Sequence, residues 1–397
     1  MTRPAELYGA RLEALLHLEG ITQTEAAARL GMSQGAVSKL INGVNPLSAE
    51  LVNRLALEFG VPRSFFARPT RDSDRAAVTF RKKSTTRSVE ERRVGVLSQL
   101  ANDLWREASQ KSGYYPFTPP DVHELDVEDG AVMLREVAGL RADAPVPSVT
   151  RMVERMGIAV VANLDPQRSY GTDMVGISRP SASEDRPVIA TLAPKRGDVQ
   201  RMTIAHELAH LLYDNDLNNP PTSRSPQERR AFEFAGALLL PEGPMRESIN
   251  ERSTLPDLLR VKARFGTSLM AIVTRAQRLH LISEMRAKSL YGQINARGWR
   301  YQEPVEVSVE RPTLFGQAAA RAWPGFSPRR ISEATGVPRA LISAWIGLPD
   351  NFAVHEDGQV IDLAARRSKK RAALNWPSSQ RRSECGRADA ENPAGRH

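Results

Sequence analysis

Cysteine and long apolar runs are nearly absent from this sequence of 397 residues. The single cysteine, Cys385, lies in a polar stretch, so the chain offers neither a disulfide framework nor a thiolate metal site, and any metal must use nitrogen and oxygen ligands. No apolar run approaches the roughly 18 residues of a membrane span, and the first residues lack a signal-peptide core. We therefore expect a soluble, cytoplasmic protein with no membrane partner.

Positive charge is in excess, but it is unevenly spread. The formal net charge is +9, and Lys and Arg outnumber Asp and Glu by 8 to 4 in residues 69–93 and by 9 to 3 in residues 364–397, but only by 7 to 6 in residues 1–68. The composition of the tail, rich in Pro, Ser, Arg and Gly, predicts disorder. Such a tail suits either weak phosphate contact or solubility, and both alternatives stay open.

The stretch TQTEAAARLGMSQGAVSKLING, residues 22–43, has the spacing of a helix-turn-helix. Thr22 and Ser33 can cap two short helices, and Gly31 supplies the turn between them, where a positive φ is needed. The pattern lies within a predicted five-helix domain that runs from about Leu7 to Phe66. Two short helices that meet at a sharp corner are therefore predicted.

This stretch resembles the Xre-type helix-turn-helix of phage repressor-like regulators, whose second helix enters the major groove of double-stranded DNA. Carried over by position, the resemblance implies two groups of DNA contacts. Base edges are expected to meet Gln34, Gly35, Ser38 and Lys39, and phosphates are expected to meet Gln23, Ser33 and Asn42. A helical bundle used only for protein contact is the alternative, and the weak charge favours dimerisation or help from residues 69–93.

Helices and strands mix in the next part of the chain. VEERRVGVLSQLANDLWREA has helical periodicity, with Val94, Leu97, Leu100 and Leu104 on its buried side. Further helices are predicted for GAVMLREVAG and VTRMVERMG, and strands for IAVVANL and PVIATLAP. A domain that contains both helix and strand is expected here.

The stretch TIAHELAHLLYD, residues 203–214, carries His206, Glu207 and His210 on an otherwise apolar helix. The two histidines lie one turn and about 40° apart, so their imidazoles can share one ion. Glu207 lies roughly 100° from His206 and can reach a water on that ion without ligating it, as in HExxH zinc peptidases. Two core histidines bonded to backbone carbonyls, or a degraded site, remain the alternatives. Asp214 lies two turns from His206 and cannot converge with both histidines.

A third ligand is expected from the second helix, SPQERRAFEFAGALLLP. On a helical wheel, Glu228 lies on the same side as the apolar residues and points inward, whereas Glu233 lies beside arginines and is expected to meet solvent. Ser225 to Glu228 also fits a capping box, in which the glutamate folds back onto the Ser225 amide. We favour the metal, because a buried carboxylate needs a cation or hydrogen-bond donors.

Residues from about 88 to 300 resemble the ImmA/IrrE family of metallo-endopeptidases, which is often fused to an Xre-type head. The residues that carry the resemblance are RMTIAHELAHLL and ERRAFEFAGALLLP, with the lead-in VMLREVAGL and VTRMVERMGIAV. The resemblance implies that His206, His210 and Glu228 bind Zn2+. Two positions depart from the family pattern: Val199 stands where Arg is frequent, and Phe232 stands where a polar residue is frequent. The loss of the polar residue at position 232 puts in doubt the hydrogen bonds that neighbouring groups give to the metal ligands.

The implied chemistry is hydrolysis of a peptide bond by zinc and one water, with Glu207 as the group that takes the proton of the water and passes it to the leaving amine. The strand PVIATLAP could hold an extended substrate by edge pairing. No residue is assigned to the oxyanion, since Tyr213 and Tyr170 are only nearby in sequence.

The last quarter of the chain predicts two more features. GWRYQEPVEVSVERP has the alternation of a strand, and RRISEATGVPRALISAWIG predicts a helix, a glycine turn and a helix. The second feature could be another helix-turn-helix, but only Gly336 and Ile342 satisfy the corner pattern and Ser332 replaces alanine. A helical cap that covers the peptidase or senses a signal is favoured.

We thus expect a mainly α fold with a small β component. The expected domains are a DNA-binding head (1–68), a basic linker (69–87), a zinc peptidase domain (88–292), a C-terminal helical sensor or cap region (293–363) and a disordered basic tail (364–397). The expected function is a DNA-binding regulator that cleaves a repressor-like protein, or itself, in response to a signal. The alternative is a transcription factor without proteolysis that uses the metal fold as a sensor or dimerisation scaffold, and either could belong to a toxin–antitoxin or phage system.

Overall fold

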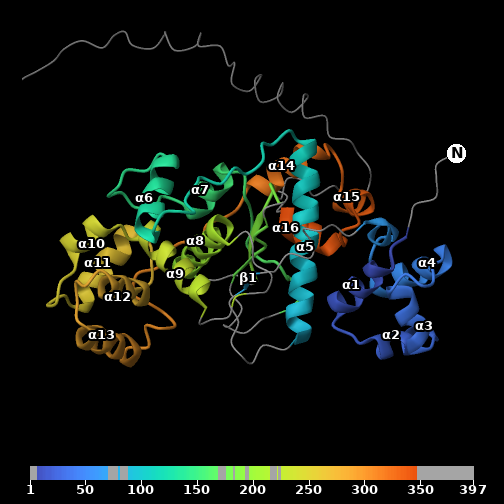
Figure 1. Ribbon diagram of the computed structural model, residues 1–397, viewed down its shortest axis with the longest axis horizontal. Helices are drawn as coiled ribbons and strands as arrows, with labels where there is room; N and C mark the ends of the chain where they lie inside the picture. The colour runs from blue at the N-terminus through green and yellow to red at the C-terminus, as the bar shows by residue number, and fades with distance from the viewer. Residues whose placement is uncertain are drawn as a thin grey trace, which may run out of the picture. The chain divides into compact units, whose positions relative to one another are not determined.

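The computed structural model describes residues 7–69, 79–80, 88–168, 176–181, 184–192, 196–214, 221 and 225–346 (Figure 1). These residues form a mainly helical fold with one small sheet, which confirms the predicted fold class. None of the helices in these ranges is long and apolar enough to cross a membrane. The predicted basic tail, 364–397, lies outside the described residues.

The N-terminal head consists of four α-helices and a 3-10 helix: α1 (Gly9–Glu19), α2 (Gln23–Leu30), α3 (Gln34–Ile41), α4 (Ala49–Phe59) and η1 (Arg63–Ala67). The Thr22 hydroxyl accepts a hydrogen bond from the Glu25 amide and so caps α2, and the Ser33 hydroxyl does the same for α3. Gly31 between them has φ 65°, which a residue with a side chain rarely adopts. The predicted caps and turn of this pair are confirmed.

The long helix α5 (Ser88–Lys111) extends the core of the head. Leu12 and Phe66 of the head belong to the same buried cluster as Leu97 and Trp105 of α5. Arg11 is almost fully buried, and its guanidinium donates to the Arg68 carbonyl (3.0 Å) and to the Asp103 carboxylate of α5 (3.4 Å). The head is therefore joined to α5 by apolar contact, by this ion pair and by a second pair between Arg68 and Glu107.

A four-stranded sheet lies beside the helices that carry the histidine motif. Its strands are β1 (Thr79–Phe80), β2 (Ala159–Val161), β3 (Gly176–Ser178) and β4 (Val188–Thr191), in the order β1-β3-β4-β2. β2 and β4 are parallel, and the other pairs are antiparallel. The sequence predicted β2 and β4 but neither β1, which falls within the predicted linker, nor β3.

Helices α6 (Val127–Val137), α7 (Val149–Arg155), α8 (Gly197–Tyr213) and α9 (Pro226–Leu239) follow the predicted pattern. Figure 1 shows α8 and α9 side by side, and their apolar faces share one core with α6 and α7. Ser225 caps α9 and Pro226 opens it, because a proline in the first turn has no amide that needs an intrahelical partner. This packing places the faces of α8 and α9 that carry polar residues against each other.

A separate apolar core holds α10 (Glu242–Ser248), α11 (Leu255–Phe265), α12 (Leu269–Arg278) and α13 (Glu284–Ala296). The expected strand that follows α13 does not form: residues 299–313 are irregular. The backbone of Glu310 bonds the side chain of Gln200 (2.7 and 2.8 Å) and not a neighbouring strand. This segment passes so close to α8 that a Cβ on Gly197 would lie 2.3 Å from two of its carbonyl oxygens. The alternating polar and apolar residues of this segment therefore pack against helix α8 and do not form a strand.

The remaining helices are α14 (Leu314–Ala322), α15 (Pro328–Thr335) and α16 (Arg339–Ile346). α14 packs on α5, and the glycine turn between α15 and α16 packs on η1 of the head, where a Cβ on Gly336 would lie 2.9 Å from the Ser64 carbonyl oxygen. The start of α16, at Arg339 and Ala340, lines a cavity together with Gly60 of the head. These helices therefore contact the head and α5 and do not line the cavity beside the histidines.

Candidate metal and peptidase site

Helix α8 carries His206, Glu207 and His210 on a stretch that is buried on every side. The three residues are at most 4% exposed. One helical turn separates the two imidazoles, and their Nε2 atoms lie 3.2 Å apart. Burial of three polar groups within one turn requires partners that offset the loss of hydration.

Glu228 comes from the first turn of α9 and points toward this pair. Its Oε1 lies 3.2 Å from Nε2 of His210 and its Oε2 lies 3.5 Å from Nε2 of His206, yet neither oxygen has a hydrogen bond of acceptable geometry in the described structure. The Ser225 hydroxyl accepts from the Glu228 amide, as expected for the cap. The carboxylate does not return to the Ser225 amide among these contacts, so it faces the histidines.

The three side chains fit a metal ion. One ligand atom from each of His206, His210 and Glu228 lies within 4.8 Å of the other two. Two imidazole nitrogens and one carboxylate oxygen are the donor set of a catalytic zinc site that keeps a fourth position open. The two buried oxygens of Glu228 that lack hydrogen bonds are the atoms that such an ion would satisfy.

The pKa shifts at the site favour a charged Glu228 and a charged His210. Burial raises the pKa of Glu228, but the contacts with His206 and His210 outweigh it and lower the pKa to about 2. Burial lowers the pKa of His210, but the contacts with Asp214 and Glu228 raise it to about 9. In the metal-free protein at neutral pH, a protonated His210 therefore faces an ionised Glu228.

The two histidines differ in the contacts that their Nδ1 atoms make. Nδ1 of His210 lies 2.6 Å from the Asp214 carboxylate, which also pairs with Arg230. Nδ1 of His206 is buried and has no hydrogen bond within the described structure, and the ring of Phe232 packs against that imidazole at 4.5 Å between centroids. Asp214 is thus no third ligand, as expected from its position, but it orients one imidazole.

The carboxylate of Glu207 faces the sheet. Its Oε2 accepts from the Ser178 hydroxyl of β3 (2.8 Å) and from the Thr79 hydroxyl of β1 (3.1 Å). Burial raises the pKa of Glu207, while the charges of His210 and His206 and the Ser178 hydrogen bond act in the opposite direction. Sequence analysis missed both hydroxyl residues, because neither strand was predicted.

A cavity of about 380 Å³ opens beside His206 and Glu207. Its walls come from α8, α9, α12 and Gly176 of β3, and most of the lining is apolar, with Val199, Met202, Phe232, Met270 and Ala271 among its residues. Glu233 lines this cavity and pairs with Arg278 of α12, and only 16% of its side chain is exposed. The expectation that Glu233 meets solvent is therefore wrong, because α12 covers that face of α9.

Residues 153–277 match the family model of the IrrE N-terminal-like domain of peptidase M78, and residues 12–66 match the helix-turn-helix family model. The chain is thus similar to a helix-turn-helix domain in its head and to an IrrE N-terminal-like domain around the histidine motif. No match was found among curated proteins. The first match contains the histidine motif, Glu228 and most of the cavity, and the second contains every residue predicted to contact DNA. The predicted resemblance to this fusion is confirmed.

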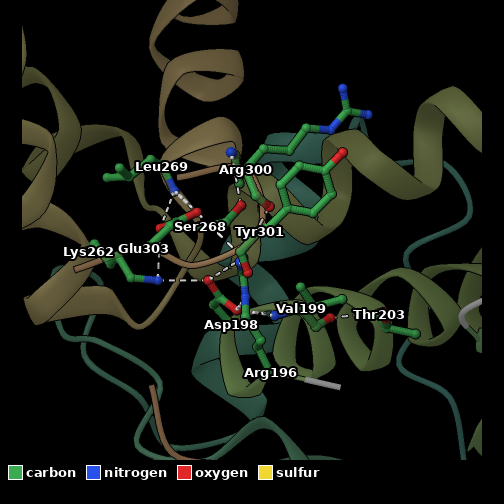
Figure 2. A network of polar contacts seen from close by, with 11 residues as sticks. Arg196, Asp198, Val199, Thr203, Lys262, Ser268, Leu269, Arg300, Tyr301 and Glu303 are labelled. Carbon is green, nitrogen blue, oxygen red and sulfur yellow. Dashed lines mark hydrogen bonds and ion pairs between the residues drawn. The ribbon is translucent and has the colours of Figure 1, made fainter. Parts of the chain in front are cut away.

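A buried ion network fixes one wall of the cavity in the IrrE-like domain (Figure 2). Figure 2 shows Lys262 of α11 between Asp198 at the start of α8 and Glu303, and its Nζ lies 2.7 and 2.9 Å from their carboxylates. Arg196 approaches the same two carboxylates, and Glu303 also accepts from the Leu269 amide at the start of α12. The network holds α8, α11 and α12 together next to the cavity.

The predicted place for substrate pairing is wrong. β4, the PVIATLAP strand, is bonded to β3 on one side and to β2 on the other, so it has no free edge. The strand next to Glu207 is β3, and its outer edge is paired with β1. Tyr213 offers nothing to an oxyanion, because its hydroxyl lies against Gly130 of α6, and Tyr170 lies outside the described residues.

The second helix of the helix-turn-helix pair, α3, presents the expected surface. Gln34, Gly35, Lys39 and Asn42 are exposed, and Ser33 at its start is exposed as well. The Gln34 amide donates to the Gln23 side chain (3.0 Å), which places the two residues together, and Asn42 donates to the Ser38 carbonyl (2.9 Å). Both groups of predicted DNA contacts therefore lie on one accessible region of the head.

Proposed function

We propose that this protein is a transcriptional regulator that binds operator DNA through α3, acts in the cytoplasm as a homodimer, and carries a zinc-dependent endopeptidase domain that cleaves a repressor-like protein or itself when a signal arrives. One observation carries the proposal: two imidazoles and one carboxylate converge in a buried site, with Glu207 beside them and a cavity that opens at the same place. A purely structural helix would gain nothing from these four polar side chains.

In this proposal His206, His210 and Glu228 hold the metal, and Glu207 moves the proton. Zinc supplies a Lewis acid and lowers the pKa of a bound water toward about 7. Glu207 takes the proton of the attacking water and delivers it to the leaving amine. Its hydrogen bonds with Ser178 and Thr79 hold the carboxylate in place. Asp214 keeps the His210 ring oriented with Nε2 toward Glu228.

The cavity supports a preference for an apolar side chain beside the scissile bond. Met202, Phe232 and Met270 form walls that favour apolar groups, because transfer of apolar surface from water stabilises the complex. The ion pair of Glu233 with Arg278 adds a polar rim. A protein segment with one large apolar residue at the cleavage point is the substrate that this shape suits.

A second candidate function is a regulator that senses metal or peptide without turnover. The observation that favours it is His206, whose Nδ1 lacks a hydrogen bond within the described structure while Phe232 packs on its ring. Groups that hydrogen-bond ligand histidines typically contribute about 10–100-fold to metal affinity or activity. A site with one unsupported histidine would bind metal more weakly than a fully supported one.

Replacement of Glu207 by Gln separates these two functions. The Glu207→Gln variant should keep zinc and operator binding but lose proteolysis by about two orders of magnitude, because the general base is gone. Purified wild-type and variant chains, loaded with zinc, are incubated with candidate repressors from neighbouring genes, and the fragments are followed by mass spectrometry. His206→Ala is the control that should lose zinc. If wild type cleaves neither a repressor nor itself, and both chains regulate a reporter equally, proteolysis is rejected.

A further inference from the structure

Two hydroxyl groups from two different strands converge on the buried carboxylate of Glu207. Ser178 Oγ lies 2.8 Å and Thr79 Oγ1 lies 3.1 Å from the same oxygen, Oε2, and the two hydroxyl oxygens lie 2.7 Å apart. Both hydroxyl residues are fully buried. Thr79 Oγ1 also lies 3.1 Å from the Ser178 carbonyl oxygen, so its single proton has two acceptors within reach, and the carboxylate is the stronger of the two. Glu207 therefore depends on these two donors for its position.

The strand register brings Thr79 to this place. Thr79 lies directly opposite Ser178 in the antiparallel pair of β1 and β3, so both side chains are on the same face of the sheet and meet Glu207 of α8. The Cβ position of Gly176, two residues before Ser178, would lie 2.8 Å from Glu207 Oε1. The other oxygen of the carboxylate is thus in close contact with the backbone of β3.

Thr79 and Ser178 come from different parts of the chain. Ser178 belongs to the peptidase domain itself, but Thr79 lies between the last residues of the head, near Arg68, and the first turn of α5 at Ser88. We propose that Thr79 is a positioning residue for Glu207, so that the segment between the DNA-binding head and the peptidase domain supplies one of the two hydroxyls that orient the general base. This inference rests on the proposed function, since it assigns Thr79 a role in the same reaction.

The chemistry of the position argues against a purely structural strand. A fully buried strand position favours Val or Ile, which bury no hydroxyl and need no partner. The Thr79 hydroxyl instead contacts a buried carboxylate, a second hydroxyl and the Ser178 carbonyl oxygen in one network. Its removal would leave the shape of the strand nearly unchanged while Glu207 loses one donor.

The test uses the full-length chain with Thr79→Val, which keeps the shape and removes the hydroxyl, and Thr79→Ser, which keeps the hydroxyl. With a repressor that wild type cleaves, Thr79→Val should lower kcat by about tenfold or more with KM unchanged, and Thr79→Ser should restore kcat to within about threefold. Thr79→Ala is used in place of Thr79→Val if thermal unfolding shows that the valine variant does not fold.

A second measurement needs no substrate. The chains are loaded with Co2+, and the visible absorption spectrum reports the surroundings of the metal. Thr79→Val should change the band positions or intensities because Glu207 moves, whereas Thr79→Ser should superimpose on wild type. Superposition of the Thr79→Val and wild-type spectra, or an equal change in Thr79→Ser, overturns the inference.

The two measurements keep this inference separate from the proposed function. If wild type cleaves a repressor but Thr79→Val has the same kcat as wild type, the proposed peptidase function is supported and the proposed role of Thr79 is rejected. If wild type cleaves nothing while the cobalt spectrum changes in Thr79→Val and recovers in Thr79→Ser, proteolysis falls and the positioning of Glu207 by Thr79 stands.

Discussion

Nδ1 of His210 lies 2.6 Å from a carboxylate oxygen of Asp214, one helical turn further along the chain. Because this bond uses Nδ1, the other ring nitrogen, Nε2, is left to face Glu228 at 3.2 Å. Arg230 of α9 contacts the second oxygen of Asp214, so the orientation of the imidazole is fixed from two helices. A carboxylate behind a ligand histidine also raises the basicity of that histidine.

We expect Asp214→Ala to weaken zinc binding by about 10–100-fold, because His210 loses the group that orients its ring. The affinity is measured by competition with a chromophoric chelator at constant pH. Glu247→Gln, an exposed carboxylate on α10, is the control and should leave the affinity unchanged. Equal affinities in Asp214→Ala and wild type would show that His210 is held by packing alone.

The sequence was sufficient for the parts of the site that depend on local spacing. His206 and His210 lie one turn apart in any helix, and the apolar face of α9 fixes the direction of Glu228, so both could be predicted. Caps such as Ser33 and Ser225 also act within four residues. These features need no knowledge of how distant segments pair.

The parts that could not be predicted depend on contacts between distant segments. Strands β1 and β3 are two and three residues long, too short for an alternating pattern, and Thr79 meets Ser178 only through their pairing across 99 positions. The burial of Glu233 depends on its contact with α12, and a helical wheel drawn for α9 alone contains no information about that contact. The expected strand near residue 305 alternates as a strand would, but it packs on α8.

Zinc binding should release a proton from His210. In the metal-free protein the pKa of His210 is raised to about 9 by Asp214 and Glu228 against the effect of burial, so this side chain is protonated at pH 7 and must lose its proton to bind a metal. The apparent zinc affinity should therefore rise by about tenfold per pH unit from pH 7 and level off near pH 9. Calorimetry at pH 7 in two buffers of different ionisation enthalpy measures the release. Identical heats in both buffers would contradict this assignment.

Lys262→Met should lower the free energy of unfolding by about 3–5 kcal/mol, because the buried carboxylates of Asp198 and Glu303 lose their buried cation and keep only the partly exposed Arg196. Urea unfolding followed by circular dichroism measures the loss. Lys288→Met is the matched control: its pair with Glu284 is exposed on α13, and the expected change is below about 1 kcal/mol. Similar losses in both variants would mean that the buried network adds nothing beyond a surface pair.

Ala271→Trp should reduce cleavage of substrates with a large apolar residue at the scissile bond. Ala271 lines the cavity, and an indole at this position would fill part of its volume of about 380 Å³. We expect kcat/KM for such substrates to fall by about tenfold or more while zinc content stays unchanged. The measurement is a set of peptides that vary only at the residues beside the cleaved bond. Ala263→Trp, on the exposed face of α11, is the control, and an equal effect there would place the substrate elsewhere.

Loss of Gln34 and Lys39 should weaken operator binding, because both side chains lie on the exposed face of α3. Gln34 is held by its hydrogen bond to Gln23, so it is already oriented before DNA arrives. Gln34→Ala with Lys39→Ala should cost about 1–3 kcal/mol per lost base contact and relax the sequence preference at the contacted positions. The operator is first selected from random DNA with the wild-type chain, and binding is then measured by gel shift at fixed salt, with Arg321→Ala on α14 as a charge control. An unaltered sequence preference in the double variant would mean that α3 does not read the bases, since loss of phosphate contacts alone weakens binding to all sequences alike.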